Sequence, residues 1–253
     1  GYVDSTASSY DIVDSASAIV GATDAILNTG GVATVTVSGV ATAEQGADID
    51  AFAKDVTYNV VDDANDIAAE LSGSNDQLDE AVSVTVTGGT VDVADAAAIQ
   101  GISGYVDSTA SSYDIVDSAS AIVGATDAIL NTGGVATVTV SGVATAEQGA
   151  DIDAFSKDVA FNVVDDAQDV IDEMTAHNEI ASAQTITVSG VATAAQGVAI
   201  NEFTKDVAFD VDSSADALAT AISGDSALLD EAGSVTVTGC LLYTSDAADD
   251  QAC

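Results

Sequence analysis

The chain has 253 residues, and its 42 acidic residues against three lysines give a formal net charge of −39 at pH 7. A surface this negative repels the phosphates of nucleic acids and anionic lipids, so neither is an expected partner. Because 47% of the residues are hydrophobic and recur periodically, we expect a packed core rather than a disordered chain. No apolar run reaches the roughly 18 residues of a membrane span, so no membrane insertion is expected.

Residues 1–52 recur without change as residues 104–155. Self-similarity of this kind indicates a repeat array, in which each unit buries its apolar face against its neighbours. The identity itself is explained equally well by recent recombination and by an error of sequence assembly. A shorter, diverged repeat underlies it, and this repeat carries the structural information.

A first family of predicted strands alternates β-branched apolar residues with Thr or Ser and closes with Gly. Its members are 34–39, 83–88, 137–142, 185–190 and 234–239. A second family places an aromatic residue before a short apolar run that ends in Asp. Its members are 10–14, 58–62, 113–117, 161–165 and 209–212. Between Gly1 or Gly104 and the following second-family strand lies a small polar stretch, which is predicted to be a loop.

Each strand is followed by a helical pattern. After first-family strands, Thr and Gln residues have the spacing of a capping box. These pairs are Thr42/Gln45, Thr145/Gln148 and Thr193/Gln196. After second-family strands, Asp62 or Asp63 is expected to cap a helix with apolar positions Ile67, Leu71 and Leu78. The last unit repeats that pattern with Leu218, Ile222 and Leu229, and the expected helix breakers are Gly73 and Gly224.

The predicted fold class is therefore α/β. Strands separated by helices must pair in parallel, so the repeat predicts a solenoid of strand–helix coils with one long parallel sheet and helices on one side. The units are about 48–55 residues long, with two coils in each. The plan resembles that of leucine-rich-repeat proteins, although their Leu/Asn consensus is missing. Separate small α/β domains are the alternative.

Two columns of aromatic residues follow from this architecture, and both are interpreted as core ladders rather than ligand-stacking surfaces. One column contains Tyr10, Tyr58, Tyr113, Phe161 and Phe209, and the other contains Phe52, Phe155 and Phe203.

The candidates for chemistry are few. Lys54, Lys157 and Lys205 each precede Asp-Val, and we expect a structural contact with the helix end and the adjacent aspartate. His177, the only histidine, is expected to be a solvated side chain. No phosphate-binding loop, nucleophile elbow, catalytic triad or zinc set is present, so no catalytic, cofactor-binding or metal residue is assigned and the chain is not expected to be an enzyme.

Clusters of aspartates recur at one corner of successive units. They are Asp62, Asp63 and Asp66; Asp165, Asp166 and Asp169; and Asp210, Asp212 and Asp216. Calcium prefers such hard oxygen ligands, whereas helix capping and the helix dipole explain the same placement without a metal. Both interpretations stay open, and diffuse binding of divalent cations is expected in either case.

The repeat array is expected to span residues 1–239 as a fragment of a longer protein. Both cysteines, Cys240 and Cys253, lie beyond it, so the array has no disulfide or cysteine-based metal site. The segment 240–250 resembles the translation of a sequencing adapter, which implies a non-native or disordered tail at 240–253 and a gene assembled from environmental DNA. A divergent capping segment is the alternative.

The composition resembles that of acidic, cysteine-free repeats in large secreted bacterial surface proteins. This resemblance implies an extracellular or cell-surface structural role, as a spacer, adhesin stalk or surface-layer component. The alternative is a calcium-dependent module that binds cell-surface glycans or copies of itself. A carboxylate-based hydrolase is the third hypothesis, and an ice-binding Thr surface is a more remote one.

Overall fold

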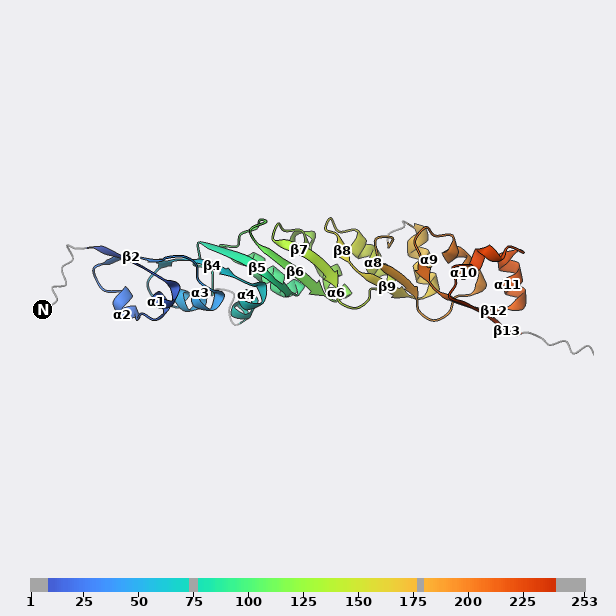
Figure 1. Ribbon diagram of the computed structural model, residues 1–253, viewed down its shortest axis with the longest axis horizontal. Coiled ribbons are helices and arrows are strands. Elements are labelled where there is room, and N and C mark those ends of the chain that lie inside the picture. Colours follow the sequence, from blue (N-terminus) through green and yellow to red (C-terminus); the bar gives the residue numbers. More distant parts are fainter. Residues whose placement is uncertain (1–8, 73–76, 177–179, 240–253) are drawn as a thin grey trace, which may run out of the picture. The chain divides into compact units, whose positions relative to one another are not determined.

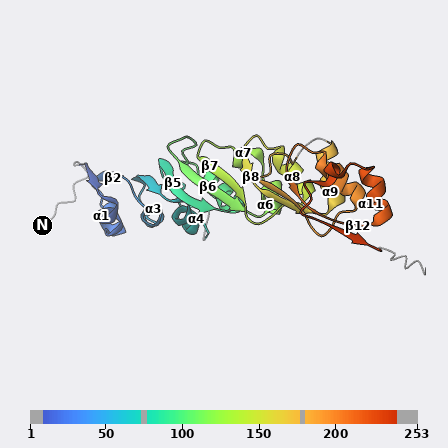
Figure 2. The same cartoon turned by 45° about the vertical axis from the view of Figure 1, so that its right-hand side comes forward.

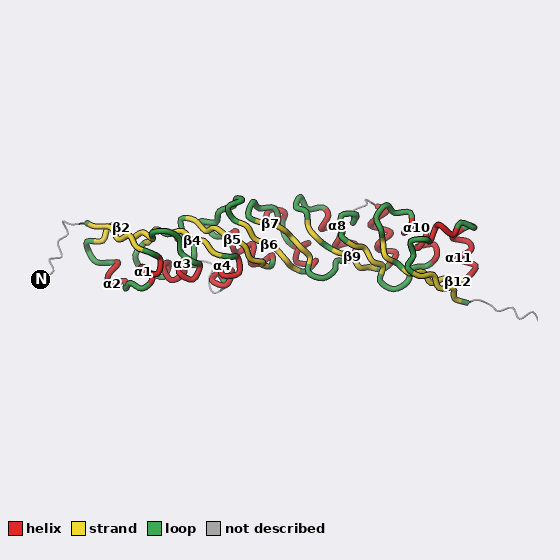
Figure 3. The backbone as a smooth tube through the Cα atoms, in the orientation of Figure 1, coloured by secondary structure: helices red, strands yellow, loops and turns green. Residues whose placement is uncertain are grey.

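The computed structural model describes residues 9–72, 77–176 and 180–239. Strands and helices alternate along this part of the chain, as the sequence predicts (Figures 1 and 3). The chain divides into two compact units, one formed by residues 1–142 with 155–160 and the other by 143–154 with 161–253. No helix in the described ranges is long and apolar enough to cross a membrane.

The strands of the first unit are β1 (Tyr10–Asp14), β2 (Val32–Val37), β3 (Val56–Thr57), β4 (Asn59–Asp62), β5 (Ser83–Val91), β6 (Ser112–Asp117), β7 (Val135–Val140) and β8 (Val159–Ala160). Its helices are α1 (Ala16–Val20), α2 (Asp24–Leu27), α3 (Ala43–Asp50), α4 (Ala64–Leu71), α5 (Val93–Gly101), α6 (Ala119–Gly124) and α7 (Asp127–Leu130).

The strands of the second unit are β9 (Asn162–Asp165), β10 (Thr185–Val188), β11 (Val207–Ala208), β12 (Asp210–Ser214) and β13 (Ser234–Thr238). Its helices are α8 (Ala146–Asp153), α9 (Ala167–Ala176), α10 (Ala194–Asn201), α11 (Ala215–Ile222) and the 3₁₀ turn η1 (Ser226–Leu229).

Neighbouring strands pair in parallel, which confirms the predicted repeating strand–helix unit. The strand orders are β1-β2-β3 and β4-β5-β6-β7-β8 in the first unit, and β9-β10-β11 and β12-β13 in the second. Figure 2 shows β5, β6 and β7 running alongside one another in the first unit. The described strands thus form several short sheets where the sequence predicts one long sheet.

Neighbouring sheets are divided at an aromatic residue of the second strand family, although β6, which contains Tyr113, is not divided. Tyr58 separates β3 from β4, so that β3 pairs with β2 and β4 pairs with β5. Phe209 likewise separates β11, which pairs with β10, from β12, which pairs with β13. The physical reason is a mismatch of spacings. Adjacent strands lie about 4.8 Å apart but packed helices need about 8–10 Å, and the breaks between β3 and β4, β8 and β9, and β11 and β12 relieve the difference.

The first-family strands have the expected two faces. Val35, Val37, Val84 and Val86 are buried, and the intervening hydroxyl residues are more exposed. The closing glycines all have positive φ, between 66° and 105°, a backbone conformation that favours glycine. These are Gly39, Gly88, Gly142, Gly190 and Gly239. The predicted break after the strand is confirmed at Gly39, Gly142 and Gly190, whereas Gly88 lies within β5, which continues to Val91 through a register shift.

The predicted helix caps are also found. All three Thr/Gln pairs form complete capping boxes at the starts of α3, α8 and α10. Asp63 caps α4, and α11 ends just before Ser223 and Gly224, which have positive φ. Leu78 is fully buried but lies after α4 rather than within it.

The two aromatic columns differ in burial. Tyr58, Tyr113 and Phe161 are each 1% exposed and Phe209 is 4% exposed, which confirms the first core ladder at these four of its five positions. Tyr10, in β1, is 44% exposed. The residues of the second column are only half-buried, so their prediction as a core ladder was wrong: Phe52, Phe155 and Phe203. They follow the ends of their helices, where less of the neighbouring coil covers them.

The predicted polar loop at 104–111 is an insertion. Tyr105 bridges to Val84 of β5, as Val56 bridges to Val35 of β2, but seven residues rather than one then precede the column aromatic. Ser111 closes the insertion, since its buried hydroxyl accepts a hydrogen bond from the Val86 N–H at 3.2 Å. The equivalent loop at 1–8, Gly73, His177 and the tail 240–253 lie outside the described residues.

Candidate functional site

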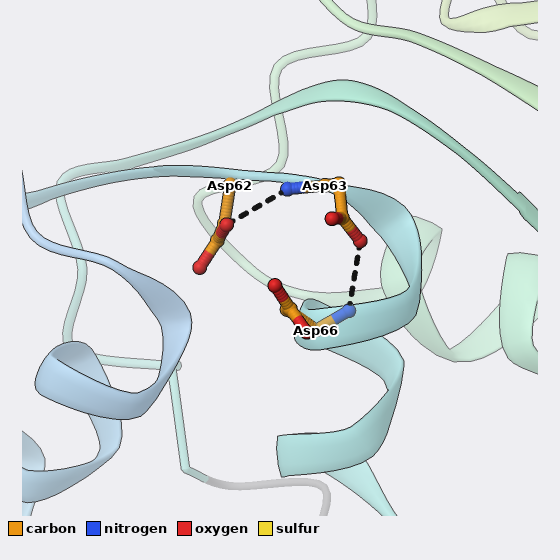
Figure 4. Close-up of side chains that lie close together, drawn as sticks. All are labelled: Asp62, Asp63 and Asp66. Atoms are coloured by element: carbon orange, nitrogen blue, oxygen red, sulfur yellow. Dashed lines mark hydrogen bonds between the residues drawn. The ribbon is translucent and has the colours of Figure 1, made fainter.

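Two groups of aspartates come together at equivalent corners. In each group, carboxylate oxygens from three residues all lie within 4.8 Å of one another. The groups are Asp62, Asp63 and Asp66 in the first unit, and Asp165, Asp166 and Asp169 in the second. Figure 4 shows the first group, at the junction of β4 and α4. We call these groups the acidic corners.

Asp62 ties two helix starts together. Its Oδ2 accepts a hydrogen bond from the backbone N–H of Ala43, the first residue of α3, at 2.9 Å. Its Oδ1 accepts from the N–H of Asp63, the cap of α4, at 3.0 Å. One carboxylate therefore stabilises two positively polarised helix N-termini that are adjacent in space.

Asp63 and Asp66 have different roles. The Oδ1 atom of Asp63 accepts from the backbone N–H groups of Asn65 at 2.9 Å and Asp66 at 3.0 Å, which is N-cap geometry. Asp66 lies in the first turn of α4, where a negative charge is favourable, and its side chain is exposed. Helix capping therefore accounts for the position of the whole corner.

The second unit repeats this arrangement. Asp165 accepts from the N–H groups of Ala146, in α8, and Asp166, both at 2.9 Å. Asp166 in turn accepts from the N–H groups of Gln168 and Asp169 at the start of α9. Asp117 of β6 makes the same two-helix contact, to Val93 at 3.1 Å and Ser118 at 2.7 Å. This bridging role of the terminal strand aspartate was not foreseen from the sequence.

The third predicted cluster does not form. Asp210 accepts a hydrogen bond from the Ser234 hydroxyl at 2.6 Å, at the beginning of β12 rather than at its end. In the last unit Ser213 and Ser214 occupy the positions of Asp165 and Asp166, and Ser214 caps α11. Asp210, Asp212 and Asp216 are therefore not equivalent to the other corners, and among the described residues only two such groups are found.

Like charges act on each other at both corners. The carboxylates of Asp63 and Asp62 raise the pKa of Asp66 above its ordinary value, because its charged form is repelled. Asp169 has a raised pKa chiefly because of Asp166, with further contributions from burial and Asp165. Asp169 and Asp165, together with Thr145, Glu147, Asp172 and Glu173, line a pocket of about 320 Å³.

Two isosteric substitutions at one corner are expected to act in opposite directions. Asp165→Asn removes a charge but also disturbs two charge-assisted hydrogen bonds, a partly buried one from the Ala146 N–H and an exposed one from the Asp166 N–H, so it should cost about 1–3 kcal/mol of unfolding free energy. Asp169→Asn removes the same charge from a repelled position and should raise Tm. Urea and thermal unfolding of the two variants measure the changes in unfolding free energy and in Tm. Equal changes of the same sign would contradict the bridging role of Asp165.

The stability of the fold is expected to rise on mild acidification. Since the folded-state pKa values of Asp66 and Asp169 are raised, the native state binds more protons than the unfolded chain, and this stabilisation is lost as pH rises through those values. Tm should therefore increase as the pH falls from neutrality towards the folded-state pKa values of these two aspartates. In the double variant Asp66→Asn/Asp169→Asn, Tm should depend less steeply on pH. An equally steep dependence in that variant would contradict the assignment of the effect to these two aspartates.

A second set of side-chain contacts recurs at the beginnings of the strands. The Asp or Asn that follows each column aromatic accepts a hydrogen bond from the first Ser or Thr of the next first-family strand. The pairs are Asp11–Thr34, Asn59–Ser83, Asp114–Thr137, Asn162–Thr185 and Asp210–Ser234, with O···O distances of 2.5–2.7 Å. These pairs could have been predicted from the sequence, because all five copies keep Asp or Asn at the first position and Ser or Thr at the second.

The lysines contact strands. Lys54 donates to the carbonyls of Val32 and Ala33 in β2, at 3.3 Å each, and Lys157 donates to the Val135 carbonyl in β7 at 2.7 Å. Their role is structural, but the partner differs from the helix end expected from the sequence. Lys205 lines an open pocket of about 620 Å³ with Thr185, Thr187 and Thr204.

The acidic corners have limited capacity for a metal. Calcium takes six to eight oxygen ligands, and here both oxygens of Asp62 and one of Asp63 already accept backbone hydrogen bonds. A cation at the corner would therefore be held mainly by the remaining oxygens and by water. Comparison with protein-family models, curated proteins and solved structures gave no match to this chain.

Proposed function

We propose that the chain is a structural repeat segment, whose units stack into one α/β solenoid that acts as a spacer or stalk of an extracellular surface protein. The observation that carries this proposal is the recurrence of the same inter-coil contacts. Three terminal strand aspartates bridge consecutive helix starts, and five Asx–Ser/Thr pairs join consecutive strands. These carboxylate, amide and hydroxyl side chains, which could otherwise take part in catalysis or binding, thus hold neighbouring coils together.

Pairing also passes through the breaks between sheets. In the first unit, an isolated parallel bridge joins Ala41, beyond the end of β2, to Val60 of β4. In the second unit, Ala192 is joined to Val211 of β12 in the same way. These bridges connect strands on the two sides of a break, and they support continuous stacking of coils. A repeat of this kind is extended by adding units, which suits a spacer.

Deletion of one complete period tests this modularity. Removing residues 53–155 joins Phe52 to Ser156, which reproduces the natural junction after Phe155, because 1–52 and 104–155 are identical. We expect a folded chain with cooperative unfolding and a urea m-value about 0.6 of the original, in proportion to length. The matched control removes residues 53–143, which leaves the repeat out of register and should abolish folding. Loss of structure in both deletions would reject the spacer hypothesis.

A second candidate function is cation-dependent ordering, favoured by the two acidic corners and their raised pKa values. A divalent cation would relieve repulsion among carboxylates that the fold holds together, so calcium should raise Tm and bind less well as pH falls. Titration calorimetry with calcium, at a constant ionic strength set by sodium chloride, measures the affinity for calcium at each pH. Saturable binding that Asp66→Asn/Asp169→Asn weakens would support it, and no binding beyond that of the matched salt would remove it.

A further inference from the structure

A pocket of about 620 Å³ in the second unit is lined by residues in and just before β10 and β11. The two strands pair in parallel, and the volume is in the range typical of ligand-binding pockets. Polar side chains predominate in the lining, and they carry amide, hydroxyl, ammonium and carboxylate groups. The polar residues are Gln184, Thr185, Thr187, Thr204, Lys205 and Asp206.

Most of these polar side chains are not used by the fold. The Thr185 hydroxyl donates to the Asn162 side chain at 2.7 Å, as one of the Asx–Ser/Thr contacts between strands. The other five side chains have no hydrogen-bond or ion-pair partner among the described residues: Gln184, Thr187, Thr204, Lys205 and Asp206. The pocket therefore gathers donors and acceptors that are available to a ligand.

The equivalent lysines of the first unit are already engaged. Lys54 and Lys157 donate to backbone carbonyls at the starts of β2 and β7, at 3.3 Å and 2.7 Å. Lys205 has the same place in the repeat, directly before Asp-Val, but makes no such bond to the described residues. Its ammonium group is therefore free to bind a ligand in the pocket that it lines.

The second unit differs from the first at other positions of the pocket too. Gln184 stands at the place of Ala136, so an amide replaces a methyl group, and Thr204 stands at the place of Ser156. The Ser156 N–H donates to the Asp127 carboxylate at 2.9 Å, whereas no described carboxylate accepts from the Thr204 N–H. The pocket is thus a local feature of one coil, and its lining gains hydrogen-bonding groups relative to the equivalent coil.

The charges of the lining select a class of ligand. Lys205 and Asp206 contribute one charge of each sign, so the lining has no net charge. An anion would also meet the chain's net charge of −39, and a cation would meet the Lys205 ammonium. An uncharged ligand with several hydroxyl groups matches the mixed lining, because each hydroxyl both donates and accepts hydrogen bonds.

We propose that this pocket binds a neutral sugar residue of a glycan. Lys205 and Gln184 donate to its hydroxyl groups, and the Asp206 carboxylate accepts from them. No aromatic ring is among the described residues that line the pocket, so binding rests on hydrogen bonds and a dissociation constant of roughly 1 mM is expected. This inference goes beyond the spacer function, because it adds a recognition site to one coil of the repeat.

The test is saturation-transfer difference NMR of the full chain, titrated with neutral oligosaccharides. The probes are cellotetraose, maltotetraose, chitotetraose and mannotetraose, with tetragalacturonate as the acidic counterpart. We expect saturable transfer to at least one neutral probe and none to tetragalacturonate. Binding of tetragalacturonate alone, or no saturable transfer to any neutral probe up to roughly 10 mM, would overturn the proposal.

Variants of the pocket locate the binding. Gln184→Ala and Lys205→Met should each weaken it about tenfold, the effect of one lost hydrogen bond. Both should stay folded, because the equivalent of Gln184 is already alanine at Ala136 and the Lys205 side chain has no partner among the described residues.

Lys157→Met is the matched control, since this lysine has the same place in the first unit and contacts a strand carbonyl there. It should leave the affinity for the sugar unchanged, and far-UV circular dichroism establishes that all three variants are folded. Binding that neither pocket variant weakens, or that Lys157→Met weakens equally, would also overturn the proposal.

Discussion

Replacing Phe161 by alanine is expected to lower the free energy of unfolding by about 3–5 kcal/mol, the largest effect of a single substitution in this chain. Phe161 is 1% exposed and lies between β8 and β9, where the second-family strand is divided. Truncation leaves a cavity against Val163 and Ile180, which are both fully buried. The side chain is thus a structural requirement of the coil and is not available for ligand stacking.

Phe203→Ala provides the matched control in the same unit. Phe203 belongs to the second aromatic column and is only half-buried, so the same truncation should cost about 1–2 kcal/mol. Urea unfolding followed by circular dichroism measures both losses. Equal losses at the two positions would contradict the distinction between a buried and a half-buried column.

Replacing Gly149 by alanine is expected to destabilise the fold by about 1–3 kcal/mol, although alanine is the better helix former. A Cβ atom at Gly149, in α8, would lie 2.9 Å from Ile180 Cγ2, 3.0 Å from Val163 Cγ2 and 3.2 Å from Phe161 Cε2. These neighbours are buried and cannot move aside without further strain. The equivalent positions Gly46 in α3 and Gly197 in α10 have equivalent close neighbours in their own coils, so these three helices approach their strands through a glycine.

Gly124→Ala is the control, since Gly124 ends α6 and a Cβ there has no atom within 4 Å. This substitution should stabilise the fold by about 0.5–1 kcal/mol. Thermal unfolding of the two variants gives the comparison. A stabilising effect of both would show that α8 is not held against the aromatic column as described.

Local features of the fold could be predicted from the sequence because they depend on nearby residues. The Thr/Gln capping boxes, the positive-φ glycines and the alternating Val faces are short-range patterns, and parallel pairing follows from the intervening helices. The division of the sheets at Tyr58 and Phe161 was not predictable in this way, because it arises from the different spacings of packed helices and paired strands.

The candidate site was predicted only in part for a similar reason. The acidic corners at Asp62 and Asp165 were predicted because aspartates cluster there in the sequence. The prediction of the third cluster was wrong because it considered only the density of aspartates. Alignment of the repeats places Ser213, not an aspartate, at the position of Asp165. The partner of Asp62 is the N–H of Ala43, nineteen positions earlier in the chain. A contact of that range becomes visible only when the coils are stacked.

Small-angle X-ray scattering of the chain tests the central claim, that the units stack into one solenoid. About ten coils spaced by the roughly 8–10 Å of packed helices give a rod of about 80–100 Å, and a radius of gyration near 25 Å. A compact globule of this length would have a radius of gyration of about 18 Å. The stacked arrangement predicts the larger value with an asymmetric pair-distance distribution. A symmetric distribution with a radius of gyration near 18 Å would contradict it.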